Sequence, residues 1–375
     1  MNKAINAKSL LLKASLIACF AAGSIVNAAE VKSKPAPKVT EQQMYDQIKY
    51  NLETNLYSLP PRIQGHYALR QYRMTGDEKY ANGALVDLLA VVDRQAYFTC
   101  QLDDPEFFAE QAKLARNQIG KGPRAKARKK ATKQFPDFVL LNDYVLRYAA
   151  RIDEMGLVGP CHEKLVEAIS KSNLKDAYTD PDMIRSWAAQ LVNYVYWADQ
   201  LGIADLREPY KKAFQQTYSD DKDAQLSKAQ YKNKIYGMTH FIFASSGYYQ
   251  RFVDAKDYQW ILDYFAANID RILQDTTEDI ITEVGISFQI TGNPDHPVVD
   301  KVKQHLLSVY SPEHKMVLSP SGKARLASGE HRNVLAMMLL NWPEKLHAGP
   351  YLSELKQTRK NLPKLVSPKP ELAKK

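Results

Sequence analysis

Apolar residues recur at helical spacing along almost the whole chain. Thr40 and Gln43 have the spacing of a capping box, and Met44, Ile48 and Leu52 then follow at four-residue intervals before a proline pair ends the segment. Alternating β-branched runs bounded by hairpin turns are missing from the sequence. We therefore predict an all-α fold.

The predicted helices recur as hairpins. An apolar first helix, a short turn with Gly, Asp or Pro, and a returning amphipathic helix can be followed about six times. First helices are expected at 66–74, 138–148, 184–200, 238–252, 280–290 and 331–340, with turns near 76, 156, 202, 254, 292 and 343. Apart from one long gap, the turns are about 40 to 50 residues apart, a spacing typical of helical repeats.

Two architectures fit these hairpins, a closed α/α toroid and an open solenoid. First helices such as 334–340 are apolar on every side, so they need burial on more than one face. This favours the closed toroid of about six hairpins.

The first turn carries a resemblance to known proteins. Residues 73–80, Arg-Met-Thr-Gly-Asp-Glu-Lys-Tyr, resemble the Tyr-Arg-x-Thr-Gly-Asp-x-Lys-Tyr turn of α/α-toroid carbohydrate enzymes, which include unsaturated-uronyl hydrolases and sugar epimerases. The resemblance covers about one hairpin, and Asp77 in it is expected to cap the turn. The whole chain also resembles a secreted proteobacterial family of unknown function. No active-site signature of the sugar enzymes is matched, so neither resemblance assigns a catalytic residue.

The start of the chain has the pattern of a secretory signal peptide. Basic residues precede an apolar stretch over 10–26, and small residues lead to Ala28. We predict a signal peptide at 1–28, a flexible linker at 29–39 and a periplasmic protein. The alternative is a lipoprotein anchored through Cys19, since Leu-Ile-Ala-Cys fits a lipoprotein pattern. No transmembrane span is expected in the mature chain.

Length and composition fit a globular protein that follows this leader. The chain has 375 residues, 45% of them hydrophobic and 25% charged. We expect a single helical domain over 40–358 and a flexible basic tail over 359–375.

The formal net charge of +9 is concentrated in a few places. The leader has three lysines, and the acid-free run 116–133 has eight cations. Together these positive charges exceed the net charge of the whole chain. This basic insertion predicts a dock for an anionic polymer or for phospholipid headgroups, with a merely solvated helix face as the alternative. Nucleic acid is not an expected partner in the periplasm. The docking residues would be Arg124, Lys126, Arg128, Lys129 and Lys130.

Two cysteines, Cys100 and Cys161, are left after signal cleavage. In an oxidising compartment they are candidates for a disulfide, and two separate buried thiols are the alternative.

The candidate site is inferred from how many residues separate each polar side chain from the turn that follows its helix. If the first helices lie parallel in an inner layer, polar residues of several hairpins reach similar heights at one rim. The candidate catalytic residues are His240, Glu283 and His331. The candidate substrate-binding residues are His66, Asp143, Arg185, Trp187, Glu330 and Arg332.

Each candidate has a structural alternative. His240 fits a satisfied core histidine, and Glu283, which interrupts an apolar run, fits an ion pair with Arg185 or Arg332. A glycosidase would need a second carboxylate, for which Asp143 or Asp137 are the options. The histidines lack the close spacing of metal ligands, so no metal or other cofactor is expected.

These patterns lead to two hypotheses of different classes. The first is a periplasmic toroid that binds, and as an enzyme would cleave or isomerise, an anionic saccharide at the ring mouth. The second is a non-catalytic helical-repeat scaffold that binds an envelope protein or polymer. Motifs of metalloproteases, serine hydrolases and nucleotide enzymes are missing from the sequence.

Overall fold

The computed structural model describes residues 39–356, which belong to the unit of the chain that begins at Val39. The predicted signal peptide with its Ala28 cleavage site, the alternative anchor Cys19, nearly all of the linker, and the basic tail lie outside the described residues.

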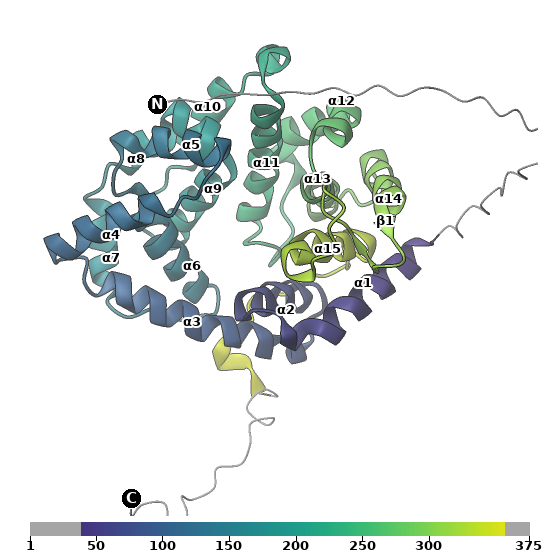
Figure 1. Cartoon of the computed structure of the whole chain (residues 1–375), viewed down its shortest axis with the longest axis horizontal. Coiled ribbons are helices and arrows are strands. Elements are labelled where there is room, and N and C mark those ends of the chain that lie inside the picture. The colour runs from purple at the N-terminus through teal and green to yellow at the C-terminus, as the bar shows by residue number, and fades with distance from the viewer. Residues whose placement is uncertain (1–38, 357–375) are drawn as a thin grey trace, which may run out of the picture. The chain divides into compact units, whose positions relative to one another are not determined.

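Helices make up most of the described chain, and the predicted all-α class is confirmed (Figure 1). The one sheet among these residues pairs the two-residue strands β1 (Tyr310–Ser311) and β2 (Met316–Val317). The α-helices are α1 (Glu41–Asn55), α2 (Pro61–Thr75), α3 (Ala81–Thr99), α4 (Pro105–Asn117), α5 (Pro123–Ala131), α6 (Arg147–Asp153), α7 (His162–Ser170), α8 (Leu174–Thr179), α9 (Pro181–Gln200), α10 (Arg207–Thr217), α11 (Lys228–Ser245), α12 (Gln259–Asp275), α13 (Glu278–Ile290), α14 (Pro297–Val309) and α15 (Leu326–Leu340). A π-helical segment, η4 (Leu140–Leu146), leads into α6, and short 3₁₀ turns join several helices.

Helix α1 begins as its sequence predicts. The Thr40 side chain accepts from the Gln43 backbone at 3.1 Å, and the Gln43 side chain accepts from the Thr40 backbone at 3.0 Å. The apolar stripe Met44, Ile48 and Leu52 is buried. Both the capping box and the buried face are confirmed.

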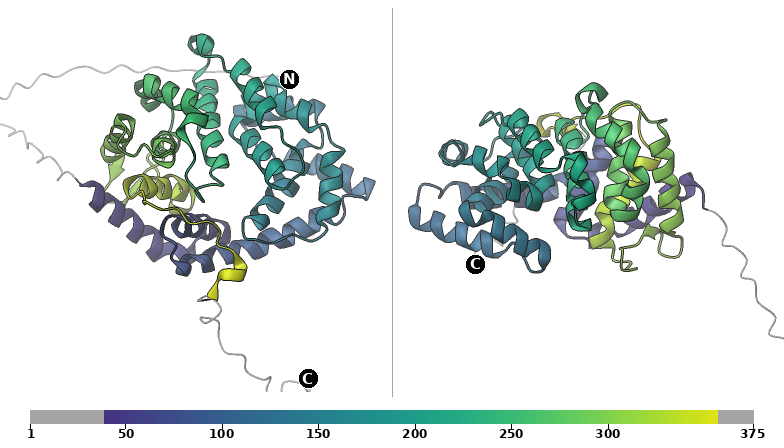
Figure 2. Two further views of the ribbon diagram at one scale, coloured as in Figure 1. Left: turned by 180° about the vertical axis from the view of Figure 1, so that it is seen from behind. Right: turned by 90° about the horizontal axis from the view of Figure 1, so that it is seen from above.

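The six predicted first helices are found as α2, η4 with α6, α9, α11, α13 and α15. Helix α9 packs on α11, α11 on α13, α13 on α15, and α15 on α2 (Figures 1 and 2). Five of these helices are followed by a returning partner, α3, α7, α10, α12 and α14.

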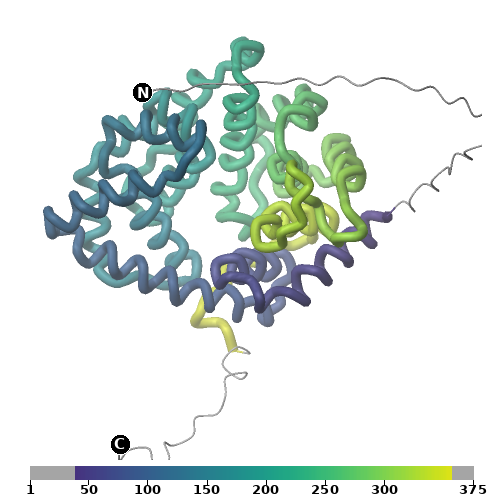
Figure 3. Tube along the Cα trace, viewed as in Figure 1, coloured from purple at the N-terminus to yellow at the C-terminus, as the bar shows by residue number. Residues whose placement is uncertain are grey.

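The sixth pair is built differently from the prediction. Between α15 and Leu355 the described chain has no further α-helix, only a short 3₁₀ turn at Leu352–Glu354. Helix α1 packs on α15 instead, so segments from opposite ends of the described chain lie side by side (Figure 3). The local hairpin expected after residue 343 is therefore replaced by a long-range pair.

Ion pairs connect α2 and α3 with α6 and the residue that follows it. Arg73 of α2 contacts Glu154, just after α6, at 2.8 Å, and Arg151 of α6 pairs with Asp87 of α3. Both α2 and α6 also pack on α3. The closed toroid stays a prediction, with the open solenoid as its alternative.

The turn with the carbohydrate-enzyme resemblance has a structural role here. Gly76 ends α2 at a φ of +69°, and a Cβ atom there would come within 2.6 Å of the His347 ring. Asp77 accepts from the Lys79 backbone at 3.0 Å, the capping role expected of it. Arg73 is 1% exposed and donates to the carbonyls of Gly349 and Tyr248.

A disulfide joins Cys100, after α3, to Cys161, before α7, with their Cα atoms 5.2 Å apart. It spans the insertion that contains α4 and α5. Across residues 39–356, no helix combines the length and apolar character that crossing a membrane requires.

Candidate functional site

The structure brings the three candidate catalytic side chains together from neighbouring helices. Glu283 of α13 lies between the other two. One carboxylate oxygen is 3.8 Å from Nδ1 of His240 on α11, and the other is 3.6 Å from Nε2 of His331 on α15. Thr239 donates to Glu283 at 2.7 Å. The proximity on which the catalytic hypothesis depends is therefore present, and the catalytic role itself stays a prediction.

Burial shifts the ionisation of this group. Glu283 is 2% exposed, and burial raises its pKa to about 7, although the His240 charge opposes the shift. Burial likewise lowers the pKa of His240. Burial, followed by the positive charge of Arg70, lowers the pKa of His331 to about 4. Near neutral pH, Glu283 is thus poised to take up or release a proton beside neutral imidazoles.

Two further candidates extend the group. His66 Nδ1 lies 2.8 Å from the Glu330 carboxylate, and His66 Nε2 lies 3.3 Å from Nδ1 of His331. Burial raises the pKa of Glu330 to about 7 and lowers that of His66. We call these five residues the imidazole–carboxylate cluster: His66, His240, Glu283, Glu330 and His331.

Counting protons along Glu330, His66, His331 and Glu283 limits their charge states. A neutral imidazole has one N–H and one bare nitrogen, and one of the two must donate across the His66–His331 contact. Nδ1 of His66 lies at hydrogen-bond distance from Glu330, so when this nitrogen is bare, the Glu330 carboxyl has to be protonated to donate to it. Nε2 of His331 is 3.6 Å from Glu283, beyond hydrogen-bond distance, so this contact does not fix the protonation of Glu283.

A pocket of about 320 Å³ adjoins this cluster at His66. Helices α2, α3, α6 and α9 contribute to its walls, together with Tyr248 after α11. We call it the arginine pocket, because its lining includes six guanidinium groups, those of Arg62, Arg70, Arg73, Arg94, Arg147 and Arg151.

Half of these guanidinium groups have a carboxylate partner. Arg73 pairs with Glu154, Arg151 with Asp87, and Arg147 with Asp143, the last at 3.3 Å.

The other three, Arg62, Arg70 and Arg94, have no carboxylate within ion-pair distance among residues 39–356. The Nε atom of Arg70 is buried without a hydrogen-bond partner. The pocket consequently holds unneutralised positive charge that suits an anion.

A backbone turn places an aromatic ring at this pocket. Three consecutive residues, Gly247, Tyr248 and Tyr249, have positive φ values of 64°, 56° and 76°. Such angles are costly for tyrosine and persist where the surroundings impose them, often at functional sites. Arg73 donates to the carbonyls of Gly247 and Tyr248, and the Tyr248 hydroxyl donates to Asn193. The strained turn is thus held from the pocket side.

The remaining candidates from the sequence lie in other settings. Asp143 accepts from Tyr194 at 2.7 Å and pairs with Arg147, so it supports the pocket wall. Arg185 is exposed and contacts Asp182, so it is no partner of Glu283. Trp187 is 2% exposed, with the Arg128 guanidinium 4.1 Å from the centre of its ring system.

Arg332 and Asp137 complete the set. Arg332 reaches the Val317 carbonyl at 3.5 Å, and none of its atoms pairs with Glu283. Asp137, one option for a second carboxylate, lines a groove beside α4. Neither residue lines the arginine pocket.

The five predicted docking residues have different surroundings in the structure. Arg128 donates to the Ser186 carbonyl at 3.0 Å and to the Gln190 side chain, so it fastens α5 to α9. Lys129 donates to the Asn117 carbonyl. Arg124, Lys126 and Lys130 are exposed and free to contact a partner.

Sequence reasoning missed the arginine pocket. One signal was available: Arg62, His66 and Arg70 follow at four-residue spacing and lie on one face of α2. The arginines of α3 and α6 carry no such signal, because only the tertiary contacts bring them to the same space. Within residues 39–356, no group of three or more His, Cys, Asp or Glu side chains is arranged to hold a metal ion.

The fold and the site define an all-α protein with a cationic pocket beside a buried acid–base cluster. Residues 41–369 match the family described as Domain of unknown function (DUF3541), and the chain belongs to this family. The expected membership in a family of unknown function is thereby confirmed. No curated protein and no solved structure matches the chain.

Proposed function

We propose that the protein binds an anionic saccharide in the arginine pocket and transfers protons to or from it through the imidazole–carboxylate cluster. The observation that carries this proposal is the set of three guanidinium groups without carboxylate partners, next to His66. A carboxylate or sulfate group on the ligand would supply the missing negative charge.

The rest of the pocket suits a sugar. Tyr148, Trp197 and Tyr248 line it, and aromatic faces stack on the apolar faces of sugar rings, while the Asn193 amide can bond hydroxyl groups. Its volume of about 320 Å³ is at the small end of ligand sites. It therefore suits the end of a saccharide chain.

His66 is the cluster member that lines the pocket, so it would be the group nearest the ligand. Glu330 behind it can hold or release a proton, and His331 connects it to Glu283. In this proposal the predicted catalytic residues His240, Glu283 and His331 tune and supply the proton that His66 exchanges.

The periplasmic location is part of the proposal. It is supported by the leader pattern of residues 1–28 and by the disulfide, which suits an oxidising compartment. Sequencing of the exported protein should begin at Ala29, and a lipid-modified Cys19 would contradict this.

The proposal is tested by calorimetric titration with acidic and neutral oligosaccharides of equal length. Acidic ligands should bind, and Arg94→Ala should weaken them about tenfold, the loss expected for one charge-assisted contact. Lys175→Ala, an exposed lysine of α8, is the matched control. Equal binding of neutral sugars, or equal losses in both variants, would contradict the proposal.

The second candidate function is a non-catalytic scaffold for an envelope polymer. The exposed Arg124, Lys126 and Lys130 on α5 favour it. Full affinity for an anionic polymer in Arg94→Ala, with loss in the triple alanine variant of α5, would support the scaffold.

A further inference from the structure

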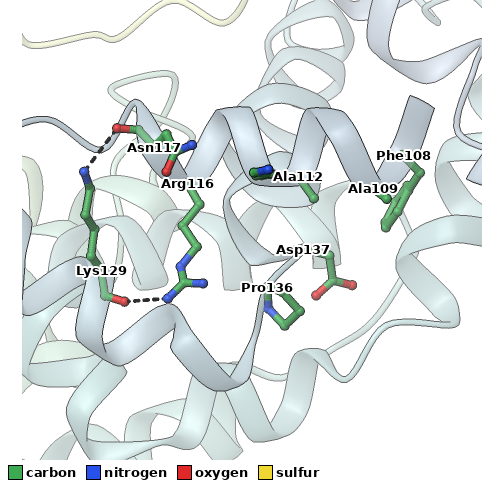
Figure 4. Close-up of a pocket in the computed structure, with 9 residues that line it drawn as sticks. Phe108, Ala109, Ala112, Arg116, Asn117, Lys129, Pro136 and Asp137 are labelled. Atoms are coloured by element: carbon green, nitrogen blue, oxygen red, sulfur yellow. Dashed lines mark hydrogen bonds between the residues drawn. The ribbon is translucent and has the colours of Figure 1, made fainter. Parts of the chain in front are cut away.

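A second hollow lies in the basic insertion, on elements that do not line the arginine pocket. It is a groove of about 700 Å³ between α4, α5 and the segment before η4 (Figure 4). Helix α4 contributes most of the lining, and Lys129, Pro136 and Asp137 complete it. We call it the α4 groove.

The lining changes character along α4. Phe108, Ala109 and Ala112 provide an apolar lining (Figure 4). Further along the helix, Lys113 and Arg116 provide cationic side chains. The spacing of these positions places them on one face of the helix. The α4 wall of the groove is therefore apolar at one end and cationic at the other.

The cations at this end are held without carboxylates. Arg116 donates to the Lys129 carbonyl at 3.2 Å, and the Lys129 ammonium donates to the Asn117 carbonyl at 3.1 Å. Among residues 39–356, no carboxylate lies within ion-pair distance of Lys113, Arg116 or Lys129. Backbone carbonyls thus fix two charges in place and leave them unneutralised.

The carboxylate of Asp137 in the lining determines which end of a ligand lies at which end of the groove. Asp137 lies on the wall opposite Ala109 and Ala112, where its charge repels an anion (Figure 4). An acidic group is favoured at Arg116 and Lys129, and an uncharged body is favoured along the first turns of α4. A hydrophilic polyanion matches one end of the groove and not the other.

We propose that the α4 groove binds a long-chain fatty acid. The carboxylate contacts Lys113, Arg116 and Lys129, and the hydrocarbon chain lies over Ala112, Ala109 and Phe108. Removal of the chain from water supplies most of the affinity, and the fixed cations select the acid over neutral lipids.

The test measures the fluorescence of dansyl-labelled undecanoic acid titrated with the full mature chain. Ala109→Trp fills the groove and should abolish binding. Ala127→Trp, at an exposed alanine of α5 that does not line the groove, is its control and should bind as the wild type does. Displacement by unlabelled palmitate should restore the free-probe signal.

A second pair of variants tests the charge. Lys113→Ala should weaken binding about tenfold, while Lys175→Ala, at an exposed lysine outside the groove, should leave it unchanged. The methyl ester of the same probe should bind at least about tenfold more weakly than the acid.

Several results would overturn the proposal. These are undetectable binding of the acid, equal affinity for the ester, an unchanged affinity in Ala109→Trp, or equal losses in the groove variants and their controls. Binding to anionic vesicles without binding of the monomeric acid would show a membrane-surface patch in place of a lipid site.

Discussion

At the scale of single residues, the buried acid–base groups set this protein apart from an ordinary helical bundle. Glu283 and Glu330 are each at most 2% exposed, and their partners within ion-pair distance are imidazoles with lowered pKa, while the permanent cation Arg70 acts on both carboxyls from a greater distance. A carboxyl group in such a place is stable chiefly in its protonated form. The cluster therefore stores a proton inside the protein.

Replacing Glu283 by glutamine separates a functional from a structural role. Glutamine copies the shape of the protonated acid, so the melting temperature should change little while ligand turnover or binding is lost. A structural carboxylate would give the reverse result, unchanged ligand affinity and a loss on the order of 3 kcal/mol in unfolding free energy. Differential scanning calorimetry and titration of the same variant decide between them.

The raised carboxyl pKa values also predict a pH dependence of stability. The folded carboxyls titrate near 7 and the unfolded ones near 4.5, so their contribution is full below pH 4.5 and is lost as pH rises through 7. The lowered histidines act oppositely, mainly below their unfolded pKa of 6.5, with a smaller opposing effect that fades by pH 8. Above pH 6.5 the carboxyls dominate within the cluster.

Urea unfolding at pH 6.5 and at pH 8 measures this effect. Each carboxyl should reduce the unfolding free energy by about 1 kcal/mol over this interval, and Glu283→Gln should remove its share. An identical pH slope in the variant and the wild type would show that Glu283 ionises normally.

At the scale of elements, helix α5 shows why charge alone is a poor guide to a surface. Its sequence has five basic residues, and this charge pattern predicts a single docking surface formed by all of them. In the structure Arg128 lies over Trp187, and burial lowers its pKa to about 10, so this arginine holds the helix in place. Only the basic residues on the exposed face of α5 remain candidates for binding an anionic polymer.

Alanine variants of α5 should therefore divide into two kinds. Arg128→Ala should lower the melting temperature, because it removes two hydrogen bonds and the stacked ring contact. Lys126→Ala with Lys130→Ala should leave the melting temperature unchanged and weaken binding to an anionic polymer at low salt. Equal melting temperatures in all variants would show that α5 is loosely attached.

Helical elements were predictable because each one carries its own periodic stripe, as Met44, Ile48 and Leu52 do. The proximity of His240, Glu283 and His331 was predictable because each lies at a similar distance before a recognisable turn. The arginine pocket was not, since Arg94 and Arg62 resemble solvated surface residues until α3 and α2 are packed together. The periodic pattern of a segment predicts its own helix, whereas the arginine pocket forms only when several helices pack together.

At the scale of the whole molecule, α1 is an integral part of the helix series. It packs on α14 and α15 and buries Met44, Ile48 and Leu52. The predicted scheme placed the returning helix of the sixth hairpin after residue 343, and α1, the first described helix, packs on α15 instead. Stability should therefore depend on α1 as strongly as on any internal helix.

Ile48→Ala tests this dependence. The cavity should reduce the unfolding free energy by about 2–4 kcal/mol, with unfolding still a single transition. Gln42→Ala, on the exposed side of α1, should have little effect. An early, separate transition in Ile48→Ala would show that α1 unfolds independently of the remaining helices.

The pairing of α1 with α15 also constrains the order of folding. Helix α1 leaves the ribosome about 270 residues before α15, so its apolar stripe stays without its native partner during most of synthesis. Because this contact closes a long loop, we expect it to form later than the local contacts within the hairpins. A chaperone that holds α1 until α15 arrives would thus act on the one helix whose partner is most distant in the chain.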